Sequence, residues 1–265
     1  MSFLRKLMPS VVFLIVSMGI SGVASAANVV VFNNGTYVDV TAITGEAVIE
    51  IATLTSQGHT VTTFTGITAA AINAATAGQD TLIIPEQQNA SLGPALSGPA
   101  IAAIVAFVNG GGQLIVHGGF GRDTVLLNSL FGFATASGIN LTGSVLTGPT
   151  AVTGISRTES ITTASLPVGA NAIYTDAGGL NTAVFDLVVG LGRVSFIGYD
   201  WFNALPTGTA DSGWLNVLDT LIVTRSQSPT NVPTLSEWSL ILLVLMMGLV
   251  GMRYGRNNKD AGKIF

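Results

Sequence analysis

The segment NGGGQLIVHGG (residues 109–119) places one short strand, Gln113 to Val116, between two glycine-rich turns. Just before it, Pro99 to Val108 has the composition of a helix, which the glycines after Asn109 would end. A short apolar run without alternation is typical of a strand that is covered on both faces. The segment therefore predicts a helix that leads into a strand of a parallel sheet.

Units of the same kind precede this segment. The expected strands are Asn28–Phe32, His59–Phe64 and Thr81–Ile84, and the expected helices between them are Val40–Thr55 and Ala69–Ala75. The first of these helices should bury a face formed by Val48, Ile51, Ala52 and Thr55. Repeated units of strand and helix predict an α/β domain with a mostly parallel sheet and helices on both faces.

The second half of the domain is less regular. Asp123 to Phe131 predicts a helix, and residues 134–169 are rich in Thr, Ser and Gly, which indicates irregular β structure or a long insertion. Thr182–Val189 and Arg193–Tyr199 flank a short glycine-containing turn and predict a β-hairpin. Trp214 to Thr224 should form the last helix of a single domain over residues 27–225, followed by a linker at 226–231.

This order of elements resembles the class I glutamine amidotransferase-like, flavodoxin-like fold, including relatives of the trehalose-utilisation type. The matching segments are Asn28–Phe32, Asn109–Gly119 and Gly192–Trp201. In active amidotransferases of that class the nucleophile is a cysteine on the turn after a central strand. This chain has no cysteine, so the thiolate mechanism is excluded, and Gly118-Gly119-Phe120-Gly121 carries no serine in its place.

Three polar side chains follow predicted strands at the carboxyl edge of the sheet. Glu86, His117 and Asp200 are therefore the candidate ligand site, because open α/β sheets bind ligands at that edge. They could act as acid and base in a surface hydrolase or carbohydrate-processing enzyme. The alternative is that His117 is a structural hydrogen-bonding residue, and His59 is expected at the surface.

Metal, cofactor and carbohydrate sites have weaker signals. Two distant histidines and no cysteine leave only a carboxylate-rich site such as one for Ca²⁺, and no contiguous calcium loop is present, so no metal site and no cofactor are predicted. Four aromatic residues near the end of the domain could form a sugar-stacking platform or pack the last helix on the sheet. They are Tyr199, Trp201, Phe202 and Trp214.

The C-terminus has the composition of a membrane anchor. A polar motif precedes an apolar run, and Arg253 and later basic residues follow it. About 20 residues suffice to cross a bilayer, so a transmembrane helix is expected at about 238–252. The positive-inside bias then places the basic tail, residues 259–265, in the cytoplasm. An ordinary single-pass anchor is the simpler alternative.

This tail resembles the IPTL-CTERM sorting domain of Gram-negative bacteria over residues 232–258. The motif residues are Val232, Pro233, Thr234, Leu235, Ser236, Glu237 and Trp238. The resemblance implies recognition of the motif by an exosortase-type membrane transpeptidase, which would process the protein near the motif and deliver it to the cell surface or extracellular matrix. These residues would be substrate features of that reaction and have no catalytic role.

The N-terminus predicts the same export route. Arg5 and Lys6 precede an apolar stretch, Val11–Ile20, and Ala24-Ser25-Ala26 supplies a small-residue cleavage site. Residues 1–26 are therefore expected to be a signal peptide used by the Sec translocon and removed by signal peptidase after Ala26. The precursor would be anchored in the inner membrane with its domain facing the periplasm.

The charge of the domain excludes some partners. Residues 27–231 contain four arginines, no lysine and twelve acidic residues, which gives a formal charge of −8. Nucleic acid is therefore not expected as a partner, whereas matrix polysaccharide is a further candidate. Two functions remain open: an exported, sorted protein with a non-catalytic binding or structural domain, or a surface enzyme that uses Glu86, His117 or Asp200.

Overall fold

A computed structural model describes residues 26–155, 157–201 and 212–226, together with Leu243 and Met247. The chain divides into two units, Met1–Ser226 and Gln227–Phe265. The predicted signal peptide up to Ser25, Phe202, the motif Val232–Trp238 and nearly all of the predicted membrane helix lie outside the described residues. Within the described residues, no helix has both the length and the apolar character that crossing a bilayer requires.

The first unit contains a mixed sheet whose central part is parallel. Its strands are β1 (Asn28–Phe32), β2 (Thr60–Phe64), β3 (Thr81–Ile84), β4 (Gln113–His117), β7 (Ile161–Thr162), β8 (Asn171–Thr175), β9 (Asn181–Val189) and β10 (Gly192–Ile197). The spatial order is β2-β1-β3-β4-β10-β9-β7, and β8 also pairs with β9. Pairs from β2 to β10 are parallel, whereas β9 pairs antiparallel with its neighbours.

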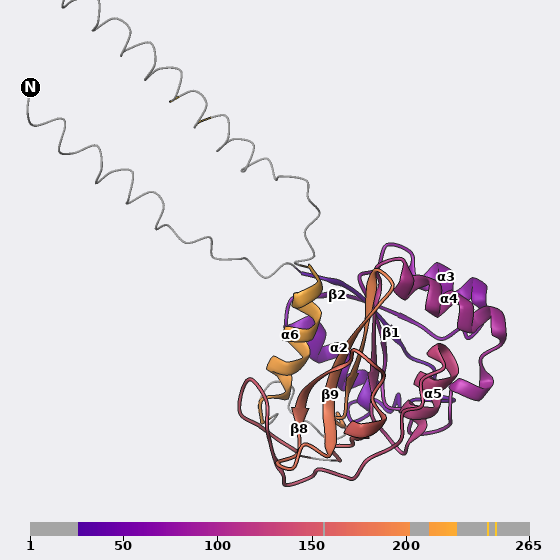
Figure 1. Cartoon of the computed structure of the whole chain (residues 1–265). Coiled ribbons are helices and arrows are strands. Elements are labelled where there is room, and N and C mark those ends of the chain that lie inside the picture. Colours follow the sequence, from indigo (N-terminus) through magenta and orange to yellow (C-terminus); the bar gives the residue numbers. More distant parts are fainter. Residues whose placement is uncertain (1–25, 156, 202–211, 227–242, 244–246, 248–265) are drawn as a thin grey trace, which may run out of the picture. The chain divides into compact units, whose positions relative to one another are not determined.

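Helices cover both faces of this sheet (Figure 1). The helices α3 (Ala69–Thr76), α4 (Gly98–Asn109) and α5 (Arg122–Phe131) pack on one face, and α2 (Glu46–Ser56) and α6 (Trp214–Ser226) on the other. Successive residues of the central strands enter different cores: Leu114 and Val116 of β4 join the first, and Ile115 joins the second. Burial on both faces explains why these strands are continuous apolar runs.

The predicted strands and helices of the first half are present, with one correction in α2. The helix begins at Glu46 and not at Val40, because Asp39 accepts hydrogen bonds from the backbone N–H and hydroxyl of Thr41, which holds a turn there. The predicted buried face is also wrong. The buried residues of α2 are Glu46, Ala47, Ile49, Glu50, Thr53 and Leu54.

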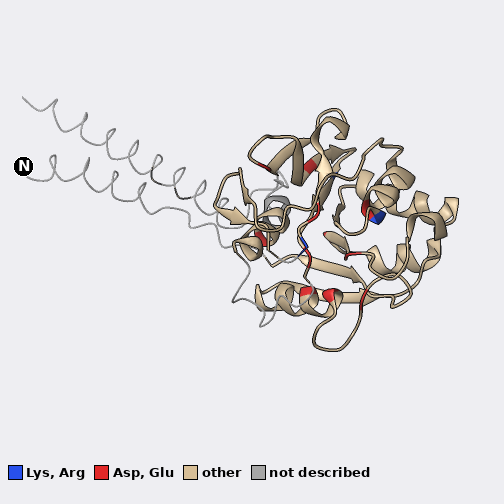
Figure 2. Ribbon diagram, turned by 90° about the horizontal axis from the view of Figure 1, so that it is seen from below, with Lys and Arg blue, Asp and Glu red and all other residues tan. Residues whose placement is uncertain are grey.

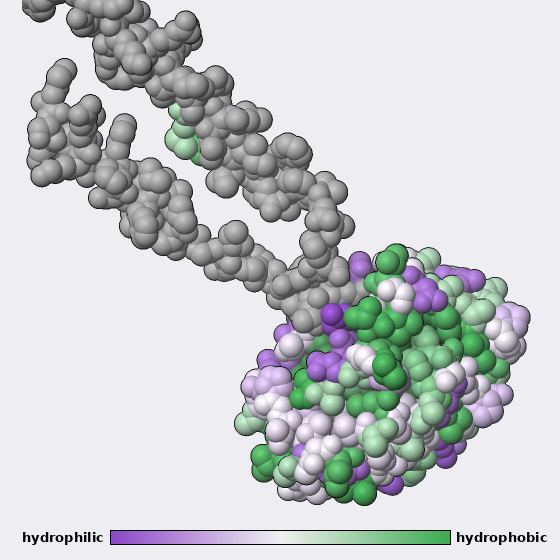
Figure 3. All heavy atoms as spheres, viewed as in Figure 1, coloured by the Kyte–Doolittle hydropathy of each residue, from purple (hydrophilic) through white to green (hydrophobic). Residues whose placement is uncertain are grey.

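The irregular segment and the hairpin agree with the sequence prediction. The described residues of 134–169 contain the two-residue strands β5 (Val145–Leu146), β6 (Val152–Thr153) and β7 and the short 3-10 helix η2 (Thr163–Ser165). The hairpin of β9 and β10 is antiparallel from Gly192 to Ile197. Val188 and Leu191 at its turn are exposed. The face of the domain seen in Figure 3 carries a broad apolar area with more polar margins.

His59 is buried, which corrects its predicted position at the surface. His59 directly precedes β2 and lies under α6, so only 7% of its surface is exposed. Its Nδ1 accepts a hydrogen bond from the backbone N–H of Ala27, and Nε2 lies 3.6 Å from Asp219 Oδ1. Burial lowers the pKa of this imidazole, although Asp219 opposes the shift.

A row of buried polar side chains crosses the sheet beneath α6. Thr81 Oγ1 donates to Gln113 Oε1, and Gln113 Nε2 donates to Ser195 Oγ and to the carbonyl oxygen of Leu221. Ser195 Oγ in turn donates to Asp186, which also accepts from Arg193 at 2.5 Å. We call Thr81, Gln113, Ser195, Asp186 and Arg193 the polar row.

Candidate functional site

Three carboxylates meet at the carboxyl edge of the sheet. Glu46 begins α2, Glu86 follows β3, and Asp200 follows β10, yet one oxygen from each lies within 4.8 Å of the other two. The chain leaves β1 toward β2 on one side and reaches β3 on the other, so the connections diverge at this edge. Open α/β sheets form their ligand crevices at such a point. We call these three residues the carboxylate cluster.

The carboxylate cluster is enclosed by protein. The exposed fractions are 1% for Glu46, 3% for Glu86 and 7% for Asp200. Among the described residues, Oε2 of Glu46 and Oε2 of Glu86 are buried and have no hydrogen-bond partner. Buried polar atoms are nearly always paired in native proteins, so two unpaired carboxylate oxygens in one cluster require an explanation.

Burial and mutual repulsion change the acidity of these groups. Burial raises the pKa of Glu46 to about 8, with further contributions from Asp200, Asp39 and Glu50. Burial likewise raises the pKa of Glu86 to about 9, and Asp200, Glu46 and Glu159 add to the rise while Arg157 opposes it. Both glutamates therefore retain protons at neutral pH unless another positive charge is present. Figure 2 shows how few basic residues the described part of the domain contains.

Gly119 leaves the space that Glu86 occupies. A Cβ atom at position 119 would lie 2.1 Å from Glu86 Cγ and 2.4 Å from Oε1, which is closer than such atoms can approach. The turn after β4 can therefore hold the Glu86 carboxyl group against the sheet only because residue 119 has no side chain. The glycines of this turn thus position a carboxylate, although they offer no nucleophile.

His117 lies at the same edge of the sheet but is enclosed in a pairing of its own. The residue has no exposed surface, and its Nε2 lies 2.7 Å from Oε1 of Glu50, which is also fully buried. Its Nδ1 accepts a hydrogen bond of 3.2 Å from the indole N–H of Trp201, so the proton of the neutral ring is on Nε2. Both ring nitrogens thus have protein neighbours.

The turn between β4 and α5 is strained at Phe120. This residue has a φ of 53° in the left-handed region, and its ring is 45% exposed. The Arg157 guanidinium lies 4.3 Å from the ring centroid, and that of Arg122 lies 5.3 Å away. Next to it, Asp123 accepts a hydrogen bond from the Gly119 backbone N–H, and burial raises the pKa of Asp123 to about 7.

The described members of the predicted aromatic group, Tyr199, Trp201 and Trp214, pack inside the domain and do not form an exposed platform. Tyr199 and Trp214 are stacked with ring centroids 5.0 Å apart, and Trp201 meets Tyr199 edge-on at 4.7 Å. All three are at most 2% exposed. They fix α6 on the sheet, which is the packing role predicted as an alternative to sugar stacking.

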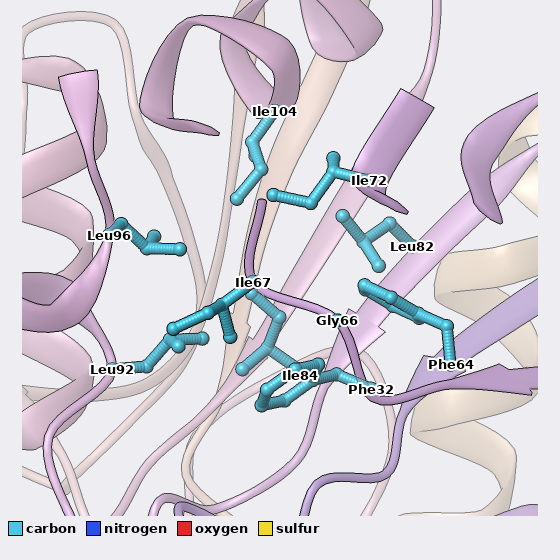
Figure 4. Close-up of a pocket in the computed structure, with 10 residues that line it drawn as sticks. All are labelled: Phe32, Phe64, Gly66, Ile67, Ile72, Leu82, Ile84, Leu92, Leu96 and Ile104. Carbon is cyan, nitrogen blue, oxygen red and sulfur yellow. The ribbon is translucent and has the colours of Figure 1, made fainter. Parts of the chain in front are cut away.

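A separate apolar pocket lies on the opposite face, between the sheet and α3 and α4 (Figure 4). It is a shallow depression with little room for a ligand, and Phe32, Ile84, Leu92 and Ile104 are among its lining residues. The lining has no charged side chain, so the pocket offers no group for acid–base chemistry. Hydrophobic side chains alone are typical of a packing gap at this edge of the core.

Sequence reasoning located two of the three clustered carboxylates and missed the third. Glu86 and Asp200 were predicted because they follow strands, whereas Glu46 was not singled out. The available signal was its position at the start of the helix that follows β1, because that helix start lies at the carboxyl edge of a parallel sheet. His117 was predicted with them, but its neighbours are Glu50 and Trp201.

Comparison with protein families identifies only the tail. Residues 230–257 match the IPTL-CTERM motif, which agrees with the resemblance found in the sequence. No curated protein is significantly similar to the chain. The motif match indicates a sorted, secreted protein that is processed at a membrane.

Solved structures resemble the domain at low sequence identity. The N-terminal domain of mmIFT52 has a TM-score of 0.52 and 10% identity, with 76% of this chain and 98% of that chain covered. A polyextremophilic β-galactosidase from the Antarctic haloarchaeon Halorubrum lacusprofundi has a TM-score of 0.50 and 13% identity, with 76% and 30% covered. The exo-β-1,4-mannosidase Op5Man5 from Opitutaceae bacterium strain TAV5 has a TM-score of 0.44 and 15% identity, with 83% and 37% covered.

These similarities concern the fold alone. The chain spans less than half of the length of the two glycosidases. The domain is therefore a mixed α/β domain with a mostly parallel central sheet.

Proposed function

We propose that this chain is the precursor of a Gram-negative surface or matrix protein that an exosortase-type transpeptidase processes at its C-terminal tail. The observation that carries the proposal is the match of residues 230–257 to the IPTL-CTERM motif. Signal peptidase would first remove residues 1–26 after Ala26, and the apolar segment at about 238–252 would hold the precursor in the inner membrane. Pro233, Thr234 and Leu235 would then be read by the transpeptidase.

The α/β domain would be the cargo of this route, with a binding or structural role and no catalytic one. Three features support this role: the chain has no cysteine, both ring nitrogens of His117 contact protein, and the carboxylate cluster is enclosed. The strand order β2-β1-β3-β4-β10 is the order of flavodoxin-like sheets, which supports the resemblance to amidotransferase-like domains. Matrix polysaccharide is the partner class that we expect for this cargo.

The sorting proposal is tested by replacing Pro233-Thr234-Leu235 with three alanines. The expected result is a precursor that stays in the membrane fraction, because the recognised motif is gone while the apolar segment remains. Release is measured by cell fractionation, and the C-terminus of released protein by mass spectrometry. Strains with and without the transpeptidase should differ for the natural chain only.

Two controls accompany this variant. Alanines at Gln227-Ser228-Pro229 change an equally long segment just before the motif and should leave release normal. His117→Ala alters the interior of the domain and should also leave delivery unchanged, because trafficking depends on the termini. Normal release of the motif variant would refute the proposal.

A further inference from the structure

We propose that Glu46, Glu86 and Asp200 bind one calcium ion at the carboxyl edge of the sheet. The sequence predicted no metal site because no contiguous ligand loop exists. The three ligands instead come from three connections that the parallel sheet brings together. The proposal concerns the domain and is independent of how the tail is processed.

The spacing of the oxygens fits a calcium ion. Calcium binds oxygen ligands at about 2.3–2.6 Å, so two of its ligands can be separated by up to about 5 Å. One oxygen from each of the three carboxylates lies within 4.8 Å of the others, so small side-chain movements bring all three to one ion. Magnesium requires distances of about 2.0–2.1 Å and ligands no more than about 4.2 Å apart, which demands a tighter arrangement.

The unpaired oxygens are a second observation that points to a ligand. Glu46 and Glu86 are each more than nine-tenths buried, and each has one buried oxygen with no partner among the described residues. Both side chains offer an oxygen to the shared cluster, so their carboxyl groups converge there. A cation between them would supply the interaction that buried carboxylates otherwise lack.

The surrounding charges also favour a cation. Asp39 and Glu50 repel the charged form of Glu46, and Glu159 repels that of Glu86. Among the described residues, Arg157 is the basic residue that lowers the pKa of Glu86, and its Nε lies 3.4 Å from Glu159 Oε1. An added divalent ion therefore meets a site with an excess of negative charge and little competing positive charge.

Gly119 is also needed for the geometry of the site, although it is not one of the three ligands. Its lack of a side chain lets the Glu86 carboxyl group lie against the turn after β4. An alanine at this position would displace Glu86 while keeping every charge of the cluster. This substitution therefore separates the geometry of the site from its net charge.

The test is a calcium titration of the full-length protein in detergent after removal of metals with EDTA. Affinity is measured by calorimetry, and the midpoint of thermal unfolding is followed in parallel. Calcium at ten times its Kd should raise the midpoint by about 3–6 °C. Glu46→Gln, Glu86→Gln and Gly119→Ala should each weaken binding at least about ten-fold, and magnesium should bind about ten-fold more weakly than calcium.

The matched control is Asp80→Asn. Asp80 accepts a hydrogen bond from the backbone N–H of Asn28 at the opposite edge of the sheet, so its loss removes a carboxylate without touching the cluster. This variant should bind calcium like the natural chain. No calcium binding, or equal binding by the Glu46, Glu86 and Asp80 variants, would overturn the site, and equal affinity for magnesium would overturn its assignment to calcium.

Discussion

Gln113 and His117 are the first and last residues of β4 and point to the same face of the sheet. The polar side chains at these two ends of the strand differ in how fully they are hydrogen-bonded. At the Gln113 end, the polar row links five side chains, and the amide of Gln113 both donates and accepts. At the His117 end, Glu46 and Glu86 each have a buried carboxylate oxygen for which the described residues provide no hydrogen bond, whereas Glu50 lies against His117 Nε2. Thr81, Gln113 and Ser195 of the polar row are as buried as Glu46 and Glu86, whereas the Arg193 side chain is 39% exposed.

This difference distinguishes polar groups that stabilise the fold from polar groups that are available to bind a ligand. A satisfied network stabilises one arrangement of strands and needs nothing from outside. Carboxylates that repel one another and lack partners lower the stability of the domain unless protons or a cation join them. The polar row therefore holds α6 on the sheet. The carboxylate cluster is the place where binding of a cation would stabilise the domain most.

The largest expected effect comes from breaking the polar row. Gln113→Ala removes the acceptor of Thr81 and the donor to Ser195 and Leu221, and it leaves a cavity beneath α6. The free energy of unfolding should fall by about 3 kcal/mol. Denaturant unfolding of the full-length protein measures this change.

The matched control for this variant is Gln79→Ala. Gln79 precedes β3 at the same edge of the sheet, and its side-chain oxygen has no partner among the described residues. Its replacement should change stability by less than about 1 kcal/mol. Similar losses in the free energy of unfolding for the two variants would show that the hydrogen bonds of the polar row do not stabilise the domain.

Strands and helices could be predicted from the sequence because burial on both faces leaves a visible apolar run. Asn28–Phe32 and Thr81–Ile84 match the structure residue for residue. The α2 helix was harder, because its buried face contains Glu46 and Glu50, and periodicity assigns acidic residues to solvent. His59 was placed at the surface because it follows Gly58 at the start of a strand, and the packing of α6 over it could not be predicted from that position.

The candidate site was predictable only in part. The rule that ligands bind at the carboxyl edge selects Glu86 and Asp200, since each follows a strand. It could not show that His117 pairs with Glu50 and Trp201, because those partners come from α2 and from the segment after β10. Long-range pairing of this kind depends on strand order, which local sequence does not specify.

The next effect, in size, is the pH dependence of the metal-free protein. The pKa values of Glu46 and Glu86 are about 8 and about 9 in the folded domain, above the ordinary value of 4.5. The folded state thus binds more protons than the unfolded state, and stability falls as pH rises through these values. Between pH 7 and pH 8 in EDTA, the free energy of unfolding should fall by about 2 kcal/mol.

Two controls make this measurement specific. Above pH 7 the lowered pKa of His59 no longer contributes, because that imidazole is neutral in both states. A double variant, Glu46→Gln with Glu86→Gln, should keep only a small slope near pH 7, which comes from Asp123, because its pKa is also raised, to about 7. Saturating calcium should also flatten the profile, because the cation replaces the protons. An unchanged slope in the double variant would assign the titration to other groups.

The smallest expected effect is a gain in stability when one carboxylate is neutralised. In EDTA at pH 8, Glu86→Gln should raise the free energy of unfolding by about 1 kcal/mol, because an amide of the same shape removes the repulsion from Asp200 and Glu46. In saturating calcium the order should reverse, since the variant loses a ligand. Denaturant unfolding in the two buffers gives both values. A variant that is less stable in both buffers would mean that the Glu86 carboxyl group is satisfied by the protein itself, and the contrast between the two ends of β4 would fail.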